Sequence, residues 1–198
     1  MPDRLLKLIA QSETLCPHLH VCAQAGEDRI LKQMRRNYDT AYYREIITKA
    51  REALPDAALG SDIIVGFPGE SEECFERQME FFGSLPLTYF HVFPYSVRSA
   101  TVAASLPDQV PAAVKKERAR KMRELGARKK KEFYRRFLGQ QVSVLVEGDL
   151  SVGGALRGYS RNYLPVSVHG GGVQVNEEVQ VAIEGFENGA LIGQVIGR

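Results

Sequence analysis

Short apolar runs alternate with segments of helical spacing in the first part of the chain. The clearest run is SDIIVGFPGE, residues 61–70, in which β-branched residues lead to Gly66 and a proline–glycine turn. Ser71 follows as a natural N-cap, and the carboxylates of Glu72 and Glu73 suit the positive end of a helix dipole. This pattern predicts a buried parallel strand, a turn and a helix. In α/β folds, ligands bind at the strand end where this turn lies.

Two similar units flank this one. The run PHLHVCAQAG at 17–26 predicts a short strand with a glycine turn, and LTYFHVFPYS at 87–96 predicts a third strand. Helical periodicity predicts helices over 2–10, 39–54, from 72 to about 83, and 111–137. Pro55 ends the second helix, and Gly83 is expected to cap the third. Strands that alternate with helices indicate a parallel sheet or part of an α/β barrel.

Beyond Gly139 the pattern changes to short alternating strands separated by glycine turns. The predicted strands cover 142–147, 155–159, 163–168, 179–183 and 191–196. Five short strands in about 60 residues are typical of a small barrel of the oligonucleotide-binding kind. We therefore place a domain boundary near residue 137, with an α/β domain over 1–137 and an all-β domain over 138–198.

Composition narrows the class of protein. Of the 198 residues, 44% are hydrophobic and 25% are charged, as in globular proteins. No run approaches the roughly 20 apolar residues of a membrane span, and no signal peptide is recognisable, so we expect a cytoplasmic protein without membrane contact. Residues 115–136 carry 12 basic and 3 acidic side chains, which concentrates the positive charge in one predicted helix.

Four potential metal ligands alternate along the first predicted strand, namely Cys16, His18, His20 and Cys22. Side chains two residues apart share one face of a strand, and cysteine and histidine are zinc ligands. Neighbouring ligands on a single strand are nevertheless too spread out to surround one ion. The sequence therefore predicts no metal site here.

These motifs resemble the C-terminal half of the radical S-adenosylmethionine tRNA methylthiotransferases. The resemblance rests on residues 18–38 and on VGFPGE at 65–70. Residues 18–38 resemble the family's runs histidine–leucine–histidine, glutamine–serine–glycine and leucine–lysine–arginine–methionine, with Ala25 in place of the serine. The resemblance covers nearly the whole chain. It implies an α/β fold that forms the second half of a radical SAM (β/α) barrel, followed by a TRAM domain, which is a small OB-like barrel that binds tRNA.

The resemblance also implies part of an S-adenosylmethionine site. The residues concerned are Gln24, Gly26, Arg36, Gly66, Val92 and Phe93. Arg36 would hold the methionine carboxylate, because a guanidinium grips a carboxylate through two parallel hydrogen bonds. Gly66 would allow close approach of the adenine. From the residues alone, Gln24 is equally a turn residue, Arg36 a solvated arginine, and Val92 and Phe93 core residues.

The family's catalytic centre is not encoded in these residues. Its 4Fe-4S cluster is held by a Cys-x-x-x-Cys-x-x-Cys loop, whereas the three cysteines here are Cys16, Cys22 and Cys74. We therefore expect no catalytic residue in this chain. It would be a fragment that is inactive alone, with the missing N-terminal half as a partner.

RNA contacts are expected at two places. In the basic helix they involve Lys129, Lys130 and Lys131, although a solvated helix face is the alternative. In the barrel they involve Arg157, Tyr159, Arg161, Asn162 and Tyr163, because aromatic rings with arginines stack on and grip RNA.

The barrel segment 158–163 also resembles the subgroup that modifies threonylcarbamoyladenosine. The expected parent activity adds a methylthio group to N6-threonylcarbamoyladenosine next to the anticodon. The alternatives are a non-catalytic tRNA-binding module and a truncated, inactive gene product.

Overall fold

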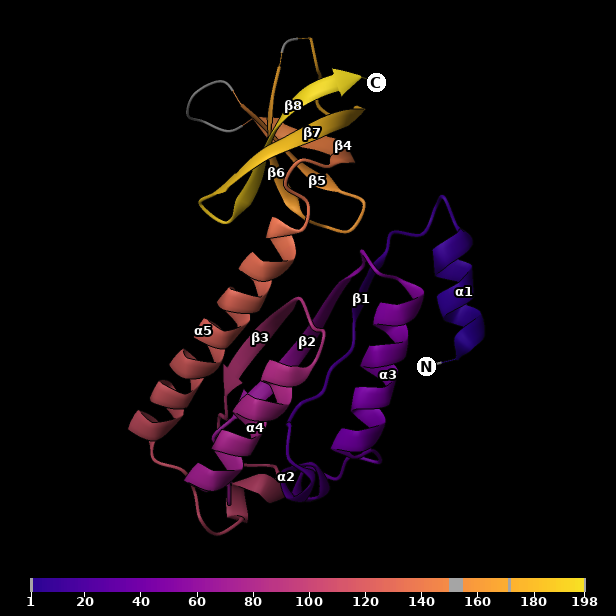
Figure 1. Ribbon diagram of the computed structural model, residues 1–198. Coiled ribbons are helices and arrows are strands. Elements are labelled where there is room, and N and C mark those ends of the chain that lie inside the picture. The colour runs from indigo at the N-terminus through magenta and orange to yellow at the C-terminus, as the bar shows by residue number, and fades with distance from the viewer. Residues whose placement is uncertain (1, 150–154, 171, 198) are drawn as a thin grey trace.

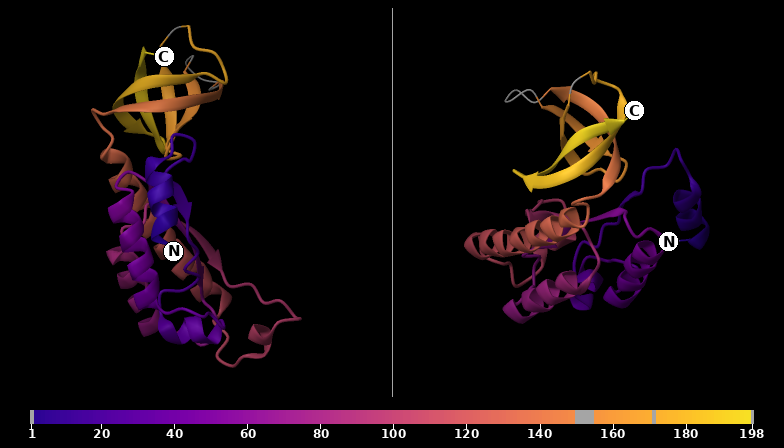
Figure 2. Two further views of the ribbon diagram at one scale, coloured as in Figure 1. Left: turned by 90° about the vertical axis from the view of Figure 1, so that its right-hand side faces the viewer. Right: turned by 45° about the horizontal axis from the view of Figure 1, so that its top comes forward.

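The computed structural model describes residues 2–149, 155–170 and 172–197. An α/β part and a five-stranded barrel are joined by the long helix α5, and the barrel lies at one end of the molecule (Figures 1 and 2). The α/β part contains α1 Asp3–Gln11, β1 His18–His20, α2 Asp28–Gln33, α3 Thr40–Ala53, β2 Ala58–Val65, α4 Glu72–Ser84, β3 Tyr89–Pro94, the short 3-10 helix η1 Val102–Ser105 and α5 Ala112–Arg135. Among the described residues, no helix is both long and apolar enough to cross a membrane.

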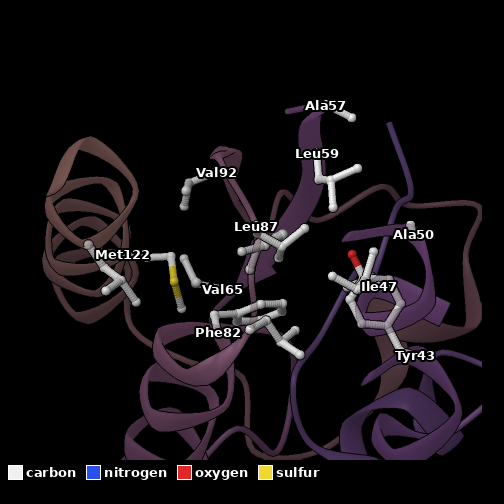
Figure 3. Packing of buried hydrophobic residues seen from close by; sticks show 14 of the residues in the cluster. Tyr43, Ile47, Ala50, Ala57, Leu59, Val65, Phe82, Leu87, Val92 and Met122 are labelled. Carbon is white, nitrogen blue, oxygen red and sulfur yellow. The ribbon is translucent and has the colours of Figure 1, made fainter. Parts of the chain in front are cut away.

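The three strands form a parallel sheet in the order β1-β2-β3, as the apolar runs predicted. Alternate residues of β2, such as Leu59 and Ile63, point into a core with side chains of α3, α4 and α5. In Figure 3 this core lies between Met122 of α5 and Ile47 of α3. All three helices therefore cover one face of the sheet. The opposite face carries Asp62 and is more exposed.

Local capping explains where the helices begin. The Asp39 carboxylate accepts a hydrogen bond from the Tyr42 amide at 2.8 Å, and the Ser71 hydroxyl accepts one from the Cys74 amide at 3.3 Å, as predicted for Ser71. The predicted cap at Gly83 is wrong. Helix α4 continues through Gly83 to Ser84, and its C-cap residue Leu85 is extended. Apolar contacts of Phe82 and Leu85 in the core favour another residue of helix over an early glycine stop.

The second part is a closed barrel in the order β4-β5-β6-β8-β7. Its strands are β4 Gln141–Asp149, β5 Leu156–Ser160, β6 Pro165–His169, β7 Glu178–Glu187 and β8 Ala190–Gly197. All five predicted strands exist with shifted bounds. Tyr163 was expected inside a strand, but its φ of 61° places it in the turn before β6. One of the glycine turns expected between the strands, at Gly153 and Gly154, lies outside the described residues.

The barrel packs against the amino ends of the sheet strands. Phe133, Tyr134 and Phe137 at the end of α5 share a buried cluster with barrel residues and with Ala58 of β2. The Asn162 amide also donates to the Asp56 carbonyl at 2.7 Å. The carboxyl ends of the strands, with their glycine turns, lie at the other end of the sheet.

Candidate functional site

The turns after β1 and β2 are joined by a buried hydrogen-bond network. The Gly26 amide donates to Gln78 Oε1 at 2.9 Å, and Gln78 Nε2 donates to Glu70 Oε2 at 2.7 Å. The Gly66 amide donates to Glu70 Oε1 at 2.8 Å. Sequence reasoning missed Gln78. The available signal was a polar residue on the apolar stripe of α4, three residues after Phe75 and four before Phe82.

Arg118 of the basic helix belongs to this network. Its Nη1 donates to Glu70 Oε1 at 2.9 Å and to the Glu70 carbonyl at 2.8 Å, and its Nη2 lies 3.0 Å from a Glu72 oxygen. Burial raises the pKa of Glu70, while the donors from Gly66, Gln78 and Arg118 oppose that shift. Arg118 therefore holds the turn and is not available to phosphate groups.

Among the predicted cofactor residues, the structure brings Gln24 and Phe93 together. Both line a cavity of about 440 Å³ at the carboxyl ends of the strands, which is also bordered by Asp62. Gln24 has a left-handed φ of 65°, and its backbone bridges to Ile63. Phe93 is 50% exposed, whereas Val92 is 8% exposed and packs in the helical core, because successive strand residues face opposite sides.

Packing against neighbouring side chains requires glycine at both of the glycines predicted to contact the cofactor, Gly26 and Gly66. A Cβ on Gly26 would lie 2.8 Å from the rings of Phe81 and Phe82. Gly66 has a φ of +73°, and a Cβ there would overlap the stem of Lys115. Burial raises the pKa of Cys22 and of Tyr38, and the charge of the exposed Arg36 opposes both shifts, which places Arg36 near the end of β1.

The uncovered face of the sheet carries a chain of polar contacts that crosses all three strands. Tyr89 Oη lies 2.8 Å from His18 Nε2 and 3.3 Å from His20 Nδ1. His20 Nε2 lies 3.0 Å from Asp62 Oδ1, and His91 Nδ1 lies 3.2 Å from the same oxygen. Burial lowers the pKa of His18, helped by His20, and burial raises the pKa of Tyr89.

Sequence reasoning found His18 and His20 but missed Asp62 and His91. Period-two alternation within each predicted strand would have shown that Asp62 and His91 lie on the same face of the sheet as each other. The strand register, which makes them neighbours, came only from the fold.

A second cavity, of about 350 Å³, lies where this face meets the barrel. The rings of His18 and Tyr163 are 4.8 Å apart between centroids, and Lys130 Nζ lies 5.3 Å above the Tyr134 ring. Aromatic and basic side chains thus gather at the junction. The ring-bearing and cationic residues of its wall are His18, Tyr89, His91, Lys130, Tyr134, Tyr159 and Tyr163.

The predicted RNA-binding lysines have different environments. Lys129 Nζ donates to the Gly83 carbonyl at 2.9 Å, and burial lowers its pKa. Lys130 lines the junction cavity, and Lys131 is exposed. The first lysine therefore has a structural contact that the other two do not share.

The predicted barrel residues divide in the same way. Asn162 is buried and bonded to Asp56, and Arg161 donates to the Glu13 carbonyl. Tyr159 and Tyr163 line the junction cavity, and Arg157 is exposed. Asn162 and Arg161 thus dock the barrel turn, while the two tyrosines present ring surface.

The three thiols do not fit a cluster site. Cys22 Sγ lies 3.5 Å from Asp62 Oδ2 on the uncovered face, whereas buried Cys74 accepts from Arg29 at 2.9 Å on the helix side. Cys16 is exposed before β1. Since the thiols lie in separate surroundings, we assign no step to an iron–sulfur cluster on these residues.

Known proteins resemble this chain in sequence. Residues 1–82 match the radical SAM superfamily. The threonylcarbamoyladenosine tRNA methylthiotransferase of Rickettsia prowazekii is 40% identical over 166 residues, covering 84% of this chain and 38% of the relative. The corresponding protein of Aquifex aeolicus is 42% identical over 146 residues, covering 74% and 36%.

A relative named for a different substrate matches over more of the chain. The tRNA-2-methylthio-N(6)-dimethylallyladenosine synthase of Thermus thermophilus is 38% identical over 199 residues, covering 98% of this chain and 42% of the relative. The chain thus spans about two fifths of the length of these curated relatives. On these motifs and matches, the chain belongs to the radical S-adenosylmethionine tRNA methylthiotransferase family.

Proposed function

We propose that this chain supplies the tRNA-contacting surface and part of the S-adenosylmethionine site of a tRNA methylthiotransferase. The observation that carries the proposal is the pair of adjoining cavities on the uncovered face. Asp62 borders one cavity and His91 borders the other, and the two side chains are 3.2 Å apart. A ligand in one cavity would therefore lie next to a ligand in the other.

The cavity at the carboxyl ends of the strands suits the nucleoside part of S-adenosylmethionine. The exposed ring of Phe93 offers a stacking surface, and Gln24 and Asp62 offer polar groups at the same wall. When bound, this cofactor supplies the radical and the methyl group of the family's chemistry. The residues here would hold and orient its nucleoside, and the cluster thiolates would come from another polypeptide segment, the N-terminal half.

The junction cavity suits a modified adenosine of tRNA. Stacking of a base on an aromatic ring contributes about 1–3 kcal/mol, and Tyr163 is 56% exposed beside His18. The threonylcarbamoyl group ends in a carboxylate, which the Lys130 ammonium at the cavity wall would attract. A dimethylallyl group has no charge for that lysine. We therefore propose N6-threonylcarbamoyladenosine as the substrate.

Binding of tRNA to four variants tests this proposal. Tyr163→Ala should weaken binding by about 1–3 kcal/mol through lost stacking. Lys130→Gln should reduce the preference for threonylcarbamoylated over unmodified tRNA. Tyr42→Ala, at a 51% exposed tyrosine of α3, and Lys49→Gln, at an α3 lysine paired with Glu45, are matched controls that should bind like the parent chain. Equal binding by all variants would contradict the proposal.

The second candidate is a tRNA-binding module without catalysis, favoured by the absence of a Cys-x-x-x-Cys-x-x-Cys loop from the 198 residues. Anaerobic reconstitution with iron and sulfide, followed by addition of the other half, separates the two candidates. The chain alone should acquire no cluster in either case. Addition of a cysteine-containing N-terminal half from a relative should restore methylthio transfer only if the chain completes an enzyme.

A further inference from the structure

Three strands each present one metal-type ligand on the uncovered face of the sheet. His20 comes from β1, Asp62 from β2 and His91 from β3. In the parallel register Asp62 lies opposite His91, and His20 lies opposite Gly60, two residues before Asp62. The ligand atoms of the three side chains all lie within 4.8 Å of one another. Strand register thus gathers residues that are far apart along the chain.

The distances are compatible with ligation of one ion. Ligand atoms at about 2.0–2.2 Å from an ion lie roughly 3–3.5 Å from one another. The observed separations are 3.0 Å from His20 Nε2 to Asp62 Oδ1 and 3.2 Å from His91 Nδ1 to the same oxygen. The two imidazole rings stack with centroids 5.1 Å apart, so a small rotation brings both nitrogens to one ion.

A neighbouring contact orients the first ligand. Metal-bound histidines almost always bond their second ring nitrogen to another group, which fixes the ring. His20 Nδ1 lies 3.3 Å from Tyr89 Oη, and that hydroxyl is also 2.8 Å from His18 Nε2. Tyr89 reaches this position because Gly60 beneath its ring has no side chain. His20 therefore presents Nε2 to Asp62.

Solvent reaches the cluster. The side chains of His20 and Asp62 are each 28% exposed, and that of His91 is 57% exposed. Cys22 Sγ lies 3.5 Å from the other Asp62 oxygen, beside the cluster but outside the group of ligand atoms that lie within 4.8 Å of one another. An ion held here would keep open positions toward the two adjoining cavities.

We propose that His20, Asp62 and His91 form a binding site for a single divalent transition-metal ion. Two imidazole nitrogens and one carboxylate oxygen form the donor set of catalytic zinc sites and of the facial triads that bind ferrous iron. This site is separate from any cysteine-held cluster and does not depend on tRNA binding. It differs from the arrangement of Cys16, His18, His20 and Cys22 along one strand segment, because it takes one ligand from each of three strands.

Titration of the metal-free, untagged chain with Co²⁺ and Zn²⁺ tests this site. One equivalent of Co²⁺ should bind and give visible absorption, and Zn²⁺ should displace it. His20→Ala, Asp62→Asn and His91→Ala should each weaken binding by about tenfold or more, since each removes a ligand. His169→Ala, at the histidine of β6, is the matched control and should bind like the parent chain.

Two further variants sharpen the result. Tyr89→Phe keeps the ring and removes the hydroxyl, so it should weaken binding by up to about tenfold if that hydroxyl orients His20. Cys22→Ser, at a thiol beside the site but outside its three ligands, should bind Co²⁺ like the parent chain. Circular dichroism of each variant establishes that it is folded. Absence of stoichiometric binding, or equal loss in His169→Ala and His20→Ala, would overturn the proposal.

Discussion

Gln78 and Glu70 are joined by a buried hydrogen bond of 2.7 Å, and this contact connects the glycine turns that follow β1 and β2. Gln78 also accepts from the Gly26 amide, and Glu70 accepts from the Gly66 amide. Both predicted cofactor turns are therefore attached to helix α4. Their spacing depends on two buried polar side chains inside an apolar core.

Replacing Gln78 with methionine tests this connection. The side chain keeps its length, but the Gly26 amide and a Glu70 oxygen lose their partner in the interior. Each unsatisfied buried group should lower the free energy of unfolding by about 1–3 kcal/mol, measured by urea denaturation. Gln11→Met, at an exposed glutamine of α1, is the matched control and should leave the midpoint unchanged. If Gln78→Met were as stable as the parent chain, the hydrogen-bond network would contribute nothing to the free energy of unfolding.

Arg118→Met should destabilise the chain strongly. The side chains of Arg118 and Glu70 are 6% and 0% exposed, so loss of the guanidinium leaves a buried carboxylate without its cation. Breaking a buried pair in this way costs about 3–5 kcal/mol of unfolding free energy. The double variant with Glu70→Gln should lose less than Arg118→Met alone. Arg120→Met, on the exposed side of α5, is the control. If Arg120→Met lost as much free energy of unfolding as Arg118→Met, the buried ion pair would be no more important than an exposed one.

Gly60→Ala should disturb the uncovered face. A Cβ at this position would overlap the Tyr89 ring and force it away from His18 and His20. Such overpacking costs about 1–3 kcal/mol, and the double variant with Tyr89→Ala should recover part of it. Gly83→Ala is the matched control. Nothing lies within 4 Å of a Cβ at this helical position, so alanine should stabilise the chain by about 0.5–1 kcal/mol in thermal and urea unfolding.

The pH dependence of stability should contain a contribution from His18. Burial lowers its folded-state pKa below 6.5, so the unfolded chain binds this proton more readily. Above pH 6.5 His18 is neutral in both states, and its contribution to the free energy of unfolding is fully present. That contribution is lost as the pH falls through the folded-state pKa of His18. His18→Phe should therefore flatten the decrease of the urea midpoint in acid. A variant with the parent chain's slope would show that His18 does not contribute.

Much of the architecture could be predicted because it depends on nearby residues. The Ser71 cap, the strand before Gly66 and the long helix after Pro111 follow from capping chemistry and periodicity within a few turns. The five barrel strands were recognisable from alternation and glycine turns. The wrong cap at Gly83 shows where this reasoning fails, since core contacts of α4 decided the end of that helix.

Contacts between distant residues decided the candidate site. Period-two alternation separates Phe93 from Val92, but only the helices on one face determine which of them is buried. Adjacent lysines of α5 acquired different roles, because helical geometry turned Lys129 toward the Gly83 carbonyl and Lys130 toward the barrel.

By itself, the sequence determined the elements, their order and the family, because local propensity and motif spacing are properties of neighbouring residues. Only the tertiary structure decided that His20, Asp62 and His91 meet, since strand register joins positions that are far apart in the chain. The fold likewise made Asn162 and Arg161 into docking residues and left Tyr163 exposed at the junction. The sequence lists the chemical groups that the chain carries. The packing of separate elements decides which of those groups face one another.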